Sequence, residues 1–199
     1  MSRQKVDVRR EEILDAAVEE VQRLGFASTR VTDVAAALGV SSGLIFYHFG
    51  TKEKLFAAAL EHAVERDLAR LKRTISKARD PLDAVRRVLA LYSPQGNAPG
   101  WTIWVDAWAE SLRSPDMRAA SRELDLRWKD VLAAQITEGV AEGQFTCADP
   151  DASAWRLSGL LDGLAVQVLV HGTLTKRQLA GWVRIAAAAE LGITPDALH

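Results

Sequence analysis

Residues 30–54 constrain the fold of this 199-residue chain more than any other stretch. A segment from Val31 to Leu38 runs into Gly39-Val40-Ser41, and a second short segment, Ser42 to Phe49, follows. Glycine after the first segment favours a left-handed backbone that turns the chain sharply without a Cβ clash. Two short helices joined in this way are typical of a helix-turn-helix, whose second helix lies in the major groove of DNA.

Helical periodicity dominates the rest of the sequence, and strand-like alternation is absent. Several helix starts are marked by a capping residue before a proline, or by a capping box. These starts are Asp80-Pro81, Ser114-Pro115, Asp149-Pro150, and Thr175 with Gln178. Thr51 is expected to cap a long helix. Glycines are expected to end helices at Gly25, Gly139, Gly143 and Gly172.

The sequence therefore predicts an all-α protein of roughly nine helices. A three-helix domain with the helix-turn-helix, residues 1–54, is followed by a C-terminal helical bundle, residues 55–199. A long helix, residues 52–78, is shared by the two domains, so no flexible linker is expected between them.

The composition excludes several classes of protein. The chain has 25 Lys and Arg against 26 Asp and Glu, so any DNA contact must come from the placement of charges rather than from bulk charge. The single Cys147 forms no intramolecular disulfide. Neither an export signal nor a long apolar span is present, which predicts a cytoplasmic protein with no membrane association.

Residues 1–12 are expected to form a flexible arm, from which Arg3 and Lys5 could reach a neighbouring groove of the DNA.

One face of the second short helix is predicted to meet DNA. Ile45 and Phe49 are four residues apart and face inward, which leaves small and polar residues outside to approach the groove or donate to phosphates and base edges. Lys52 and, more weakly, Thr32 each stand at a helix start, where a phosphate is favoured. The candidate DNA contacts are Thr32, Ser41, Ser42, Gly43, Leu44, Tyr47, His48 and Lys52.

Over residues 8–60 the chain resembles the TetR family of bacterial transcriptional regulators. The matching residues are Gly25-Phe26, Val31 to Leu38, Gly39-Val40-Ser41, Gly43, Tyr47-His48-Phe49 and Lys52-Glu53-Lys54-Leu55. Residues 101–170 are similar, more loosely, to the C-terminal domains of one branch of that family. The chain differs from the family at Arg30-Val31, where family members often have Thr. Without a hydroxyl at these positions, Thr32 is the nearest residue whose hydroxyl could contact a phosphate.

The resemblance implies a transcriptional regulator rather than an enzyme. It implies a homodimer whose N-terminal domain binds palindromic double-stranded operator DNA and whose C-terminal domain holds a small-molecule pocket and the dimer interface. We expect a repressor that is released by a small-molecule effector of unknown identity, through a change transmitted along the long helix. The alternative is a helical interaction module, or an activator without small-molecule control.

Catalytic and metal-dependent functions find little support. Residues 39–43, GVSSG, match the G-x-S-x-G pattern of serine hydrolases, but that motif needs a strand before the serine, here Ser41, where a helix is predicted. The histidines lack the spacing of metal ligands. They are His48, His62, His171 and His199. We therefore expect no catalytic residue, no metal and no cofactor.

Three tryptophans mark a candidate effector site. Trp101, Trp104 and Trp108 recur at i, i+3 and i+7 beside the Pro- and Gly-rich segment 93–100, so they share one helical face. For any one of them, core packing is the simpler interpretation. Together they are typical of the lining of a cavity for a flat or cationic ligand.

Other polar and aromatic residues complete the effector hypothesis. Asp106 and Glu110 are near the tryptophans but are expected to face solvent. Trp128 and Asp162 are further ligand-binding candidates. Asp162 stands in a very apolar helix, where it is either a buried polar anchor near the pocket or a partner at a dimer interface.

The last two helices are predicted to form the dimer interface. Residues 150–171 and 176–191 are apolar nearly all round, and this excess needs a partner beyond the domain itself. Gly159 and Gly163 would allow close approach of helices. A four-helix bundle formed by two copies is the economical explanation.

Overall fold

The computed structural model describes residues 3–94 and 99–198, with the side chains of residues 10–94 and 100–198. Over these ranges it has nine α-helices, one 3-10 helix and no strand, which confirms the predicted all-α class. The elements are α1 (Arg3–Leu24), α2 (Val31–Leu38), α3 (Ser42–Phe49), α4 (Lys52–Ile75), α5 (Pro81–Tyr92), α6 (Pro99–Ser111), α7 (Pro115–Ala141), α8 (Pro150–Leu169), α9 (Lys176–Leu191) and η1 (Pro195–Leu198).

The helices begin where the sequence places capping residues. The side chains of Asp80, Asp149 and Thr175 each accept a hydrogen bond from the backbone N–H three residues further on. Thr51 Oγ1 accepts from the N–H of Lys54 at 3.2 Å. These bonds satisfy N–H groups that the first turn of a helix leaves without intrahelical partners.

Backbone packing divides the chain into two compact units. Unit 1 comprises Met1–Asp67 and Pro99–Leu124, and unit 2 comprises Leu68–Ala98 and Asp125–His199. Both α4 and α7 begin in unit 1 and end in unit 2. The predicted boundary at residue 54 stays a prediction, and this packing groups α6 with the N-terminal helices.

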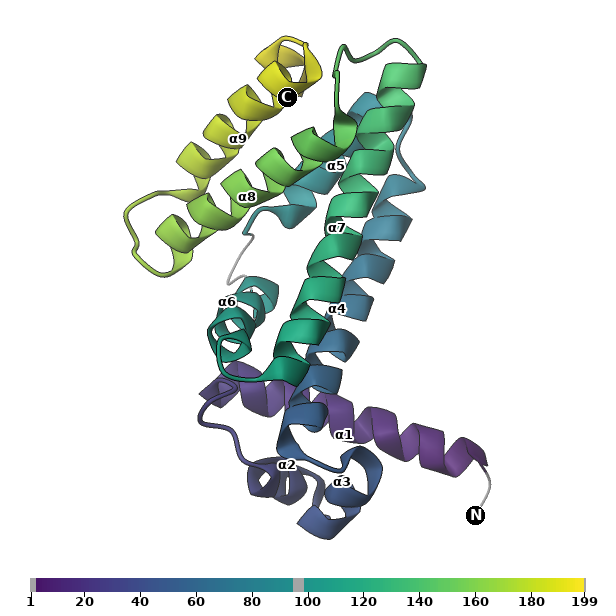
Figure 1. The fold of residues 1–199 in the computed structure, drawn as a ribbon, viewed down its shortest axis with the longest axis vertical. Coiled ribbons are helices and arrows are strands. Elements are labelled where there is room, and N and C mark those ends of the chain that lie inside the picture. Colours follow the sequence, from purple (N-terminus) through teal and green to yellow (C-terminus); the bar gives the residue numbers. More distant parts are fainter. Residues whose placement is uncertain (1–2, 95–98, 199) are drawn as a thin grey trace. The chain divides into compact units, whose positions relative to one another are not determined.

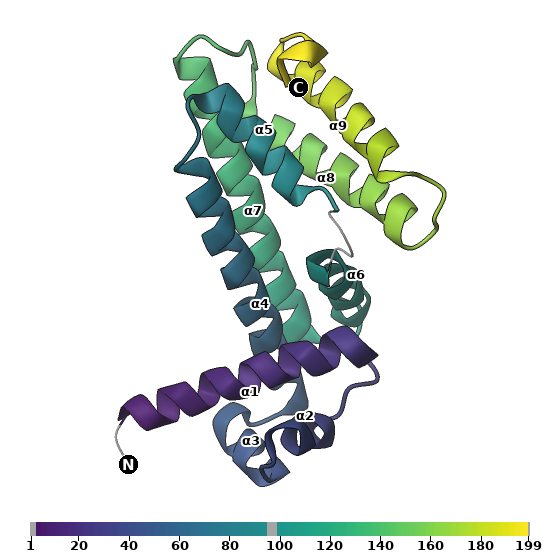
Figure 2. The same ribbon diagram turned by 180° about the vertical axis from the view of Figure 1, so that it is seen from behind.

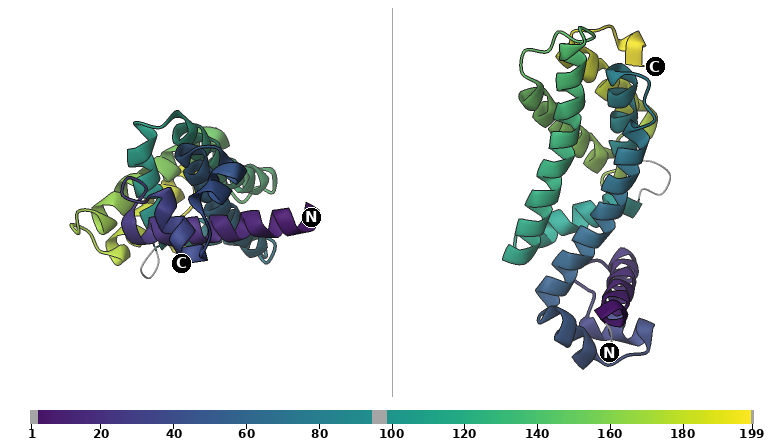
Figure 3. Two further views of the ribbon diagram at one scale, coloured as in Figure 1. Left: turned by 90° about the horizontal axis from the view of Figure 1, so that it is seen from below. Right: turned by 90° about the vertical axis from the view of Figure 1, so that its right-hand side faces the viewer.

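Unit 1 contains the helix-turn-helix. α1, α2 and α3 lie together in every view (Figure 1, Figure 2 and Figure 3). Their apolar residues Ile13, Val34 and Ile45 are fully buried. Gly39, between α2 and α3, has a φ of 63°, the left-handed backbone that the sequence predicts for it.

The expected flexible arm is instead part of the first helix. α1 already begins at Arg3, so residues 3–12 are helical. This stretch contains no Gly or Pro and is rich in Arg, Gln, Lys and Glu, which favour helix once a nucleus exists further along. The side chains of Arg3 and Lys5 lie outside the described residues.

Unit 2 is organised around the pair of α8 and α9. The two helices lie side by side (Figure 1 and Figure 2), and Leu157, Leu161 and Leu179 are buried in their packing. The N–H of Thr146 donates to the carbonyl of Leu191 at 2.9 Å, which holds the segment between α7 and α8 against the end of α9.

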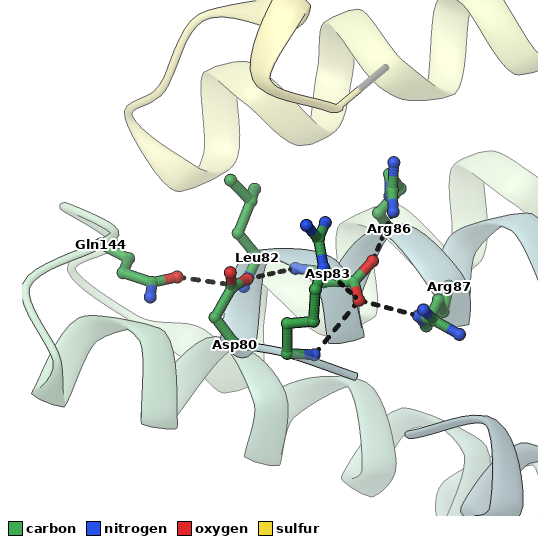
Figure 4. A network of polar contacts seen from close by, with 7 residues as sticks. Asp80, Leu82, Asp83, Arg86, Arg87 and Gln144 are labelled. Atoms are coloured by element: carbon green, nitrogen blue, oxygen red, sulfur yellow. Dashed lines mark hydrogen bonds and ion pairs between the residues drawn. The ribbon is translucent and has the colours of Figure 1, made fainter. Parts of the chain in front are cut away.

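A charged network secures the start of α5 (Figure 4). The Asp83 side chain is 1% exposed and pairs with three arginines, Arg79, Arg86 and Arg87. The hydrogen bond from Arg86, supported by Arg79 and Arg87, outweighs burial and holds the pKa of Asp83 well below its usual range. Beside it, the N–H of Leu82 donates to Gln144 Oε1 at 3.1 Å.

Gly139 does not end α7, contrary to the prediction. The helix runs on to Ala141, and Gly143 makes the turn with a φ of 71°. Gly139 lies in the last turn, where the buried ring of Phe145 packs so closely that a Cβ would overlap it. The glycine is needed for packing, which a pattern of glycines along the sequence does not distinguish from a turn.

Among the described residues, no single helix has the length and apolar character to cross a membrane. α2 and α3 reach that length and composition only when combined, across a bend of 114°.

Gly139→Ala should destabilise the protein by about 1–3 kcal/mol, because the added methyl forces Phe145 to move. Gly181→Ala is the matched control: it also lies within a helix, but a Cβ there meets nothing within 4 Å. It should be neutral or stabilise by about 0.5–1 kcal/mol, since alanine favours helix. Urea unfolding followed by circular dichroism measures both changes. Equal effects would refute the packing role of Gly139.

Candidate functional site

α3 turns one face inward and the other to solvent. Ile45 and Phe49 are buried, as their spacing predicts. Tyr47 is 82% exposed and Phe46 is 44% exposed. Gly43 is exposed too, one helical turn before Tyr47, so these two residues form the centre of the outer face. Of the predicted contacts on α3, Ser42, Leu44 and His48 are half-buried at its sides.

Ser41 and Gly43 stand at the start of α3 in different roles. Ser41 caps the helix, and its Oγ accepts from the N–H of Leu44 at 3.3 Å, which leaves its O–H able to donate. Gly43 has an ordinary helical backbone, and a Cβ there would meet only Ser41 Oγ, at 3.8 Å. The described part of the chain does not require glycine at this position. Because Gly43 has no side chain, another molecule can approach the backbone of α3 closely at this position.

Some of the cations beside α3 contact aromatic rings, and others are exposed to solvent. Lys52 begins α4, and its Nζ lies 5.3 Å from the centre of the Phe56 ring. The guanidinium of Arg10 lies 4.9 Å over the ring of Phe49. Lys54, like Thr32 at the start of α2, is exposed. Helix starts and side chains together thus offer several donors to phosphates.

Asp106 faces the α1–α2 turn and not solvent, which corrects the sequence prediction. Its Oδ2 accepts a hydrogen bond of 2.5 Å from the N–H of Phe26. Gly25 next to it has a φ of 81°, and a Cβ there would lie 3.1 Å from the same oxygen. The buried Phe26 ring in turn packs edge-on against Phe56 of α4. No local pattern reveals this contact, because its partners are distant in sequence.

The three tryptophans of α6 do lie against one another. The ring centres of Trp101 and Trp108 are 6.1 Å apart, and those of Trp104 and Trp108 are 6.3 Å apart. All three are half-buried, whereas Ile103 and Ala107 of the same helix are fully buried. The stripe is therefore a partly accessible indole surface, and the core of unit 1 takes the other face of α6.

Trp128 and Asp162 of unit 2 are joined by Tyr92, a residue that the sequence analysis missed. Tyr92, at the end of α5, donates from its hydroxyl to Asp162 Oδ1 at 3.2 Å. Its ring packs edge-on against Trp128, with centres 5.1 Å apart. Trp128 Nε1 is buried and has no hydrogen-bond partner among the described residues. Of the two interpretations left open for Asp162, this geometry favours the buried polar anchor.

Burial changes the acidity of this cluster. It raises the pKa of Asp162 to about 6, with a further rise from Asp125, while the Tyr92 hydroxyl and the charge of Lys129 act in the opposite direction. Burial likewise raises the pKa of Tyr92. Lys129 is itself 5% exposed, pairs with Asp125, and places its Nζ 4.5 Å over the ring of Trp155. The cluster thus combines two aromatic rings with a carboxylate that is costly to ionise, an environment suited to a cation.

Unit 2 has a cavity of about 440 Å³ that does not include the Tyr92, Trp128 and Asp162 cluster. Its lining comes from α5, α9, η1 and Ser93, and it includes three arginines and no acidic residue. The lining residues are Arg86, Leu89, Ala90, Ser93, Arg177, Ala180, Gly181, Val183, Arg184 and Leu198. This cavity does not suit a cationic ligand.

α8 and α9, with Val170 at the end of α8, also leave large apolar side chains exposed, which we call the apolar face of α8 and α9. Trp155, Val170, Trp182 and Ile185 are each about half exposed, between 47% and 56%. On the same pair of helices, a Cβ added at Gly159 or Gly163 would meet nothing within 4 Å.

Among the described residues, no three His, Cys, Asp or Glu side chains come together as metal ligands. His48 contacts aromatic rings instead, edge-on to Tyr47 at 5.5 Å.

Two family profiles match the sequence. Residues 13–59 match the profile of bacterial regulatory proteins of the tetR family. Residues 78–192, more than half of the chain, match that of the C-terminal domain of BetI-type transcriptional repressors.

Individual relatives agree with these profiles. The HTH-type transcriptional regulator BetI of Paraburkholderia xenovorans is 29% identical over 174 residues, which cover 83% of this chain and 84% of the relative. A transcriptional regulator from Saccharomonospora viridis, solved in complex with choline, is 29% identical with a TM-score of 0.79 and covers 89% of this chain and 94% of its own. A TetR-family regulator from Rhodococcus sp., 23% identical over 94% of this chain and 98% of its own, has the same fold with a TM-score of 0.79.

Proposed function

Because this chain belongs to the TetR family of bacterial transcriptional regulators and carries a BetI-type C-terminal domain, we propose that it binds a palindromic operator as a homodimer in the cytoplasm and is released by a small organic cation. The family confirms the predicted class, a DNA-binding regulator and not an enzyme. The observation that carries the proposal is the helix-turn-helix, whose second helix leaves Tyr47 82% exposed.

We assign DNA binding to the outer face of α3 and to the helix starts beside it. Gly43 and Tyr47 enter the major groove, flanked by Ser42, Leu44 and His48. Lys52, Thr32 and the hydroxyl of Ser41 donate to phosphates, where a helix N-terminus adds favourable charge. Phosphate contacts position the protein without reading sequence, so affinity and specificity reside in different residues.

The protein should shift DNA from the region upstream of its own gene in a gel-shift assay. Lys52→Ala should weaken binding to all duplexes alike and reduce the slope of log affinity against log salt by about 1, as loss of one phosphate contact does. Lys72→Ala, in the last turn of the same helix and exposed, should leave the slope unchanged. An altered sequence preference in Lys52→Ala would contradict the phosphate role.

We assign the dimer interface to the exposed apolar face of α8 and α9. An apolar face of this extent on a single chain marks a protein–protein contact. Glycine inside a helix costs about 1 kcal/mol relative to alanine, yet nothing in the described chain obstructs a side chain at Gly159 or Gly163. A second copy packed closely against α8 explains both features, in a four-helix bundle with two-fold symmetry.

Ile185→Asp should convert the dimer to a monomer, because it would bury two unpaired carboxylates in a symmetric interface. Leu112→Asp is the control, a residue 76% exposed on a different segment, and it should remain dimeric. Sedimentation velocity at micromolar concentration distinguishes the two. A wild-type monomer, or an unchanged dimer in Ile185→Asp, would overturn this interface.

We assign effector binding to Tyr92, Trp128 and Asp162. The relative from Saccharomonospora viridis was solved with choline, whose trimethylammonium group binds aromatic faces and carboxylates. The three side chains supply two rings and one carboxylate within unit 2. The Trp101, Trp104 and Trp108 stripe is the alternative site; it offers indole surface, but its nearby carboxylate, Asp106, is already bonded to Phe26.

Choline should bind the wild-type protein more tightly than its neutral isostere, in which a tert-butyl group replaces the trimethylammonium. Because the folded protein keeps Asp162 protonated up to about pH 6, and a cation favours the ionised form, choline affinity should rise roughly tenfold from pH 5 to pH 7.5 and then level off. Titration calorimetry at several pH values measures this dependence.

Asp162→Asn should weaken choline binding by about tenfold and remove its pH dependence. Asp130→Asn, an exposed change on α7, is the control and should do neither. Loss of choline binding in Trp104→Ala, with Asp162→Asn unaffected, would transfer the site to α6.

A further inference from the structure

The recognition helix lacks the side chains that read most bases. α3 has the sequence SGLIFYHF, with no guanidinium, ammonium, amide or carboxylate among its eight residues. Those groups read guanine, adenine and cytosine in the major groove through hydrogen bonds to base edges, often paired ones. The hydroxyls of Ser42 and Tyr47 and the imidazole of His48 offer single hydrogen bonds and so discriminate weakly between bases.

What α3 offers instead is apolar and aromatic surface. Tyr47 is 82% exposed, Phe46 is 44% exposed, and Leu44 is half-buried on the side of Tyr47 opposite to Phe46. The rings of Tyr47 and His48 pack edge to face, which holds the tyrosine ring in place. In the major groove the C5-methyl of thymine is the apolar group that such surfaces contact.

Gly43 brings this surface within reach of the bases. It lies one turn before Tyr47 on the outer face, and neither its backbone nor its neighbours require glycine. A missing side chain here lets the helix backbone approach the DNA closely. The cations that hold phosphates, Lys52 and Lys54, stand outside α3 and leave its face to the bases.

We infer that this protein reads its operator through thymine methyl groups, with the ring of Tyr47 as the main contact and Phe46 and Leu44 beside it. The inference rests on the proposed binding of operator DNA by α3. It assigns sequence specificity to apolar contacts and affinity to the phosphate-binding cations. The operator half-site should then carry at least one thymine whose methyl group is buried by Tyr47.

Replacing thymine by deoxyuridine tests this directly, because it removes the methyl group and keeps every hydrogen-bonding group. The full-length protein is first used to enrich duplexes from a randomised library. Each thymine of the enriched site is then replaced singly by deoxyuridine, and binding is measured by fluorescence anisotropy. At one or more positions in each half-site, affinity should fall about fourfold, the effect of losing one buried methyl. Minor-groove contacts are insensitive to this change, since the methyl lies in the major groove.

Variants of Tyr47 link the methyl to its contact. Tyr47→Phe keeps the ring and should keep the fourfold response to deoxyuridine. Tyr47→Ala should bind the thymine site more weakly and lose the response at that position, and its exposed side chain makes unfolding an implausible cause. Circular dichroism confirms that the fold is retained.

The outcomes separate this inference from the proposed function. Failure to enrich any duplex would overturn operator binding and the methyl readout with it. An enriched site that is bound equally well with deoxyuridine throughout, or that contains no thymine in its half-sites, would overturn the methyl readout alone.

Discussion

The hydrogen bond from the Phe26 N–H to the Asp106 carboxylate joins segments eighty residues apart, and the organisation of unit 1 depends on it. The amide belongs to the turn that follows α1 and leads into α2. Gly25 is required beside it twice over, for its positive φ and for the space that the Asp106 oxygen occupies. The same turn carries Phe26, whose buried ring contacts Phe56 of α4. One carboxylate thus fixes the position from which the recognition helix is presented.

This contact explains why α6 packs with the DNA-binding helices. Ile103 and Ala107 are buried on the face of α6 that carries Asp106, while the tryptophans lie on another face. Coupling between two sites needs an element whose arrangement both can bias. α6 meets the α1–α2 turn directly and continues through α7 into unit 2. A displacement of α6 would therefore change the turn that precedes the helix-turn-helix through the side chain of Asp106 alone.

The sequence was sufficient where structure is set by neighbours along the chain. Gly39, the N-caps at Thr51 and Thr175, and the inward pair Ile45 and Phe49 all act over four residues or fewer, and all were predicted. Prediction from the sequence failed where a residue contacts a partner that is distant along the chain. Asp106 has no local reason to avoid solvent, since its partner is a backbone N–H near the other end of unit 1.

The same limit applies to Gly139 and Tyr92. Gly139 resembles a helix end unless the ring of Phe145 is known to fold back on it. Tyr92 resembles any apolar position of an amphipathic helix until Asp162, seventy residues on, is placed against its hydroxyl. Phe46 is different: its place on the α3 helical wheel was available from the sequence, and exposure follows from the inward direction of Ile45 and Phe49.

Asp162, which we assign to the effector site, lowers the stability of the folded protein at neutral pH. Because its pKa is raised in the folded state, the folded protein holds a proton that the unfolded chain releases between about pH 4 and pH 6. Stability therefore falls as pH rises through that window, and the loss is complete above it. The charge of Lys129 relieves this only in part, since Lys129 is shared with Asp125 and with the ring of Trp155. A ligand cation would supply the missing charge, so part of its binding free energy is the recovery of this cost.

Lys129 also connects the charge of the cluster to the apolar face of α8. Its ammonium rests on Trp155, which is 55% exposed and belongs to the proposed dimer interface. In the proposed effector site, a cation beside Asp162 would repel Lys129, whose ammonium already contacts Asp125 and the ring of Trp155. If Trp155 packs against a second copy, as proposed, that copy would restrict where Lys129 can move. Effector binding and dimer packing would then be coupled through this lysine, and by linkage each would change the other by the same free energy.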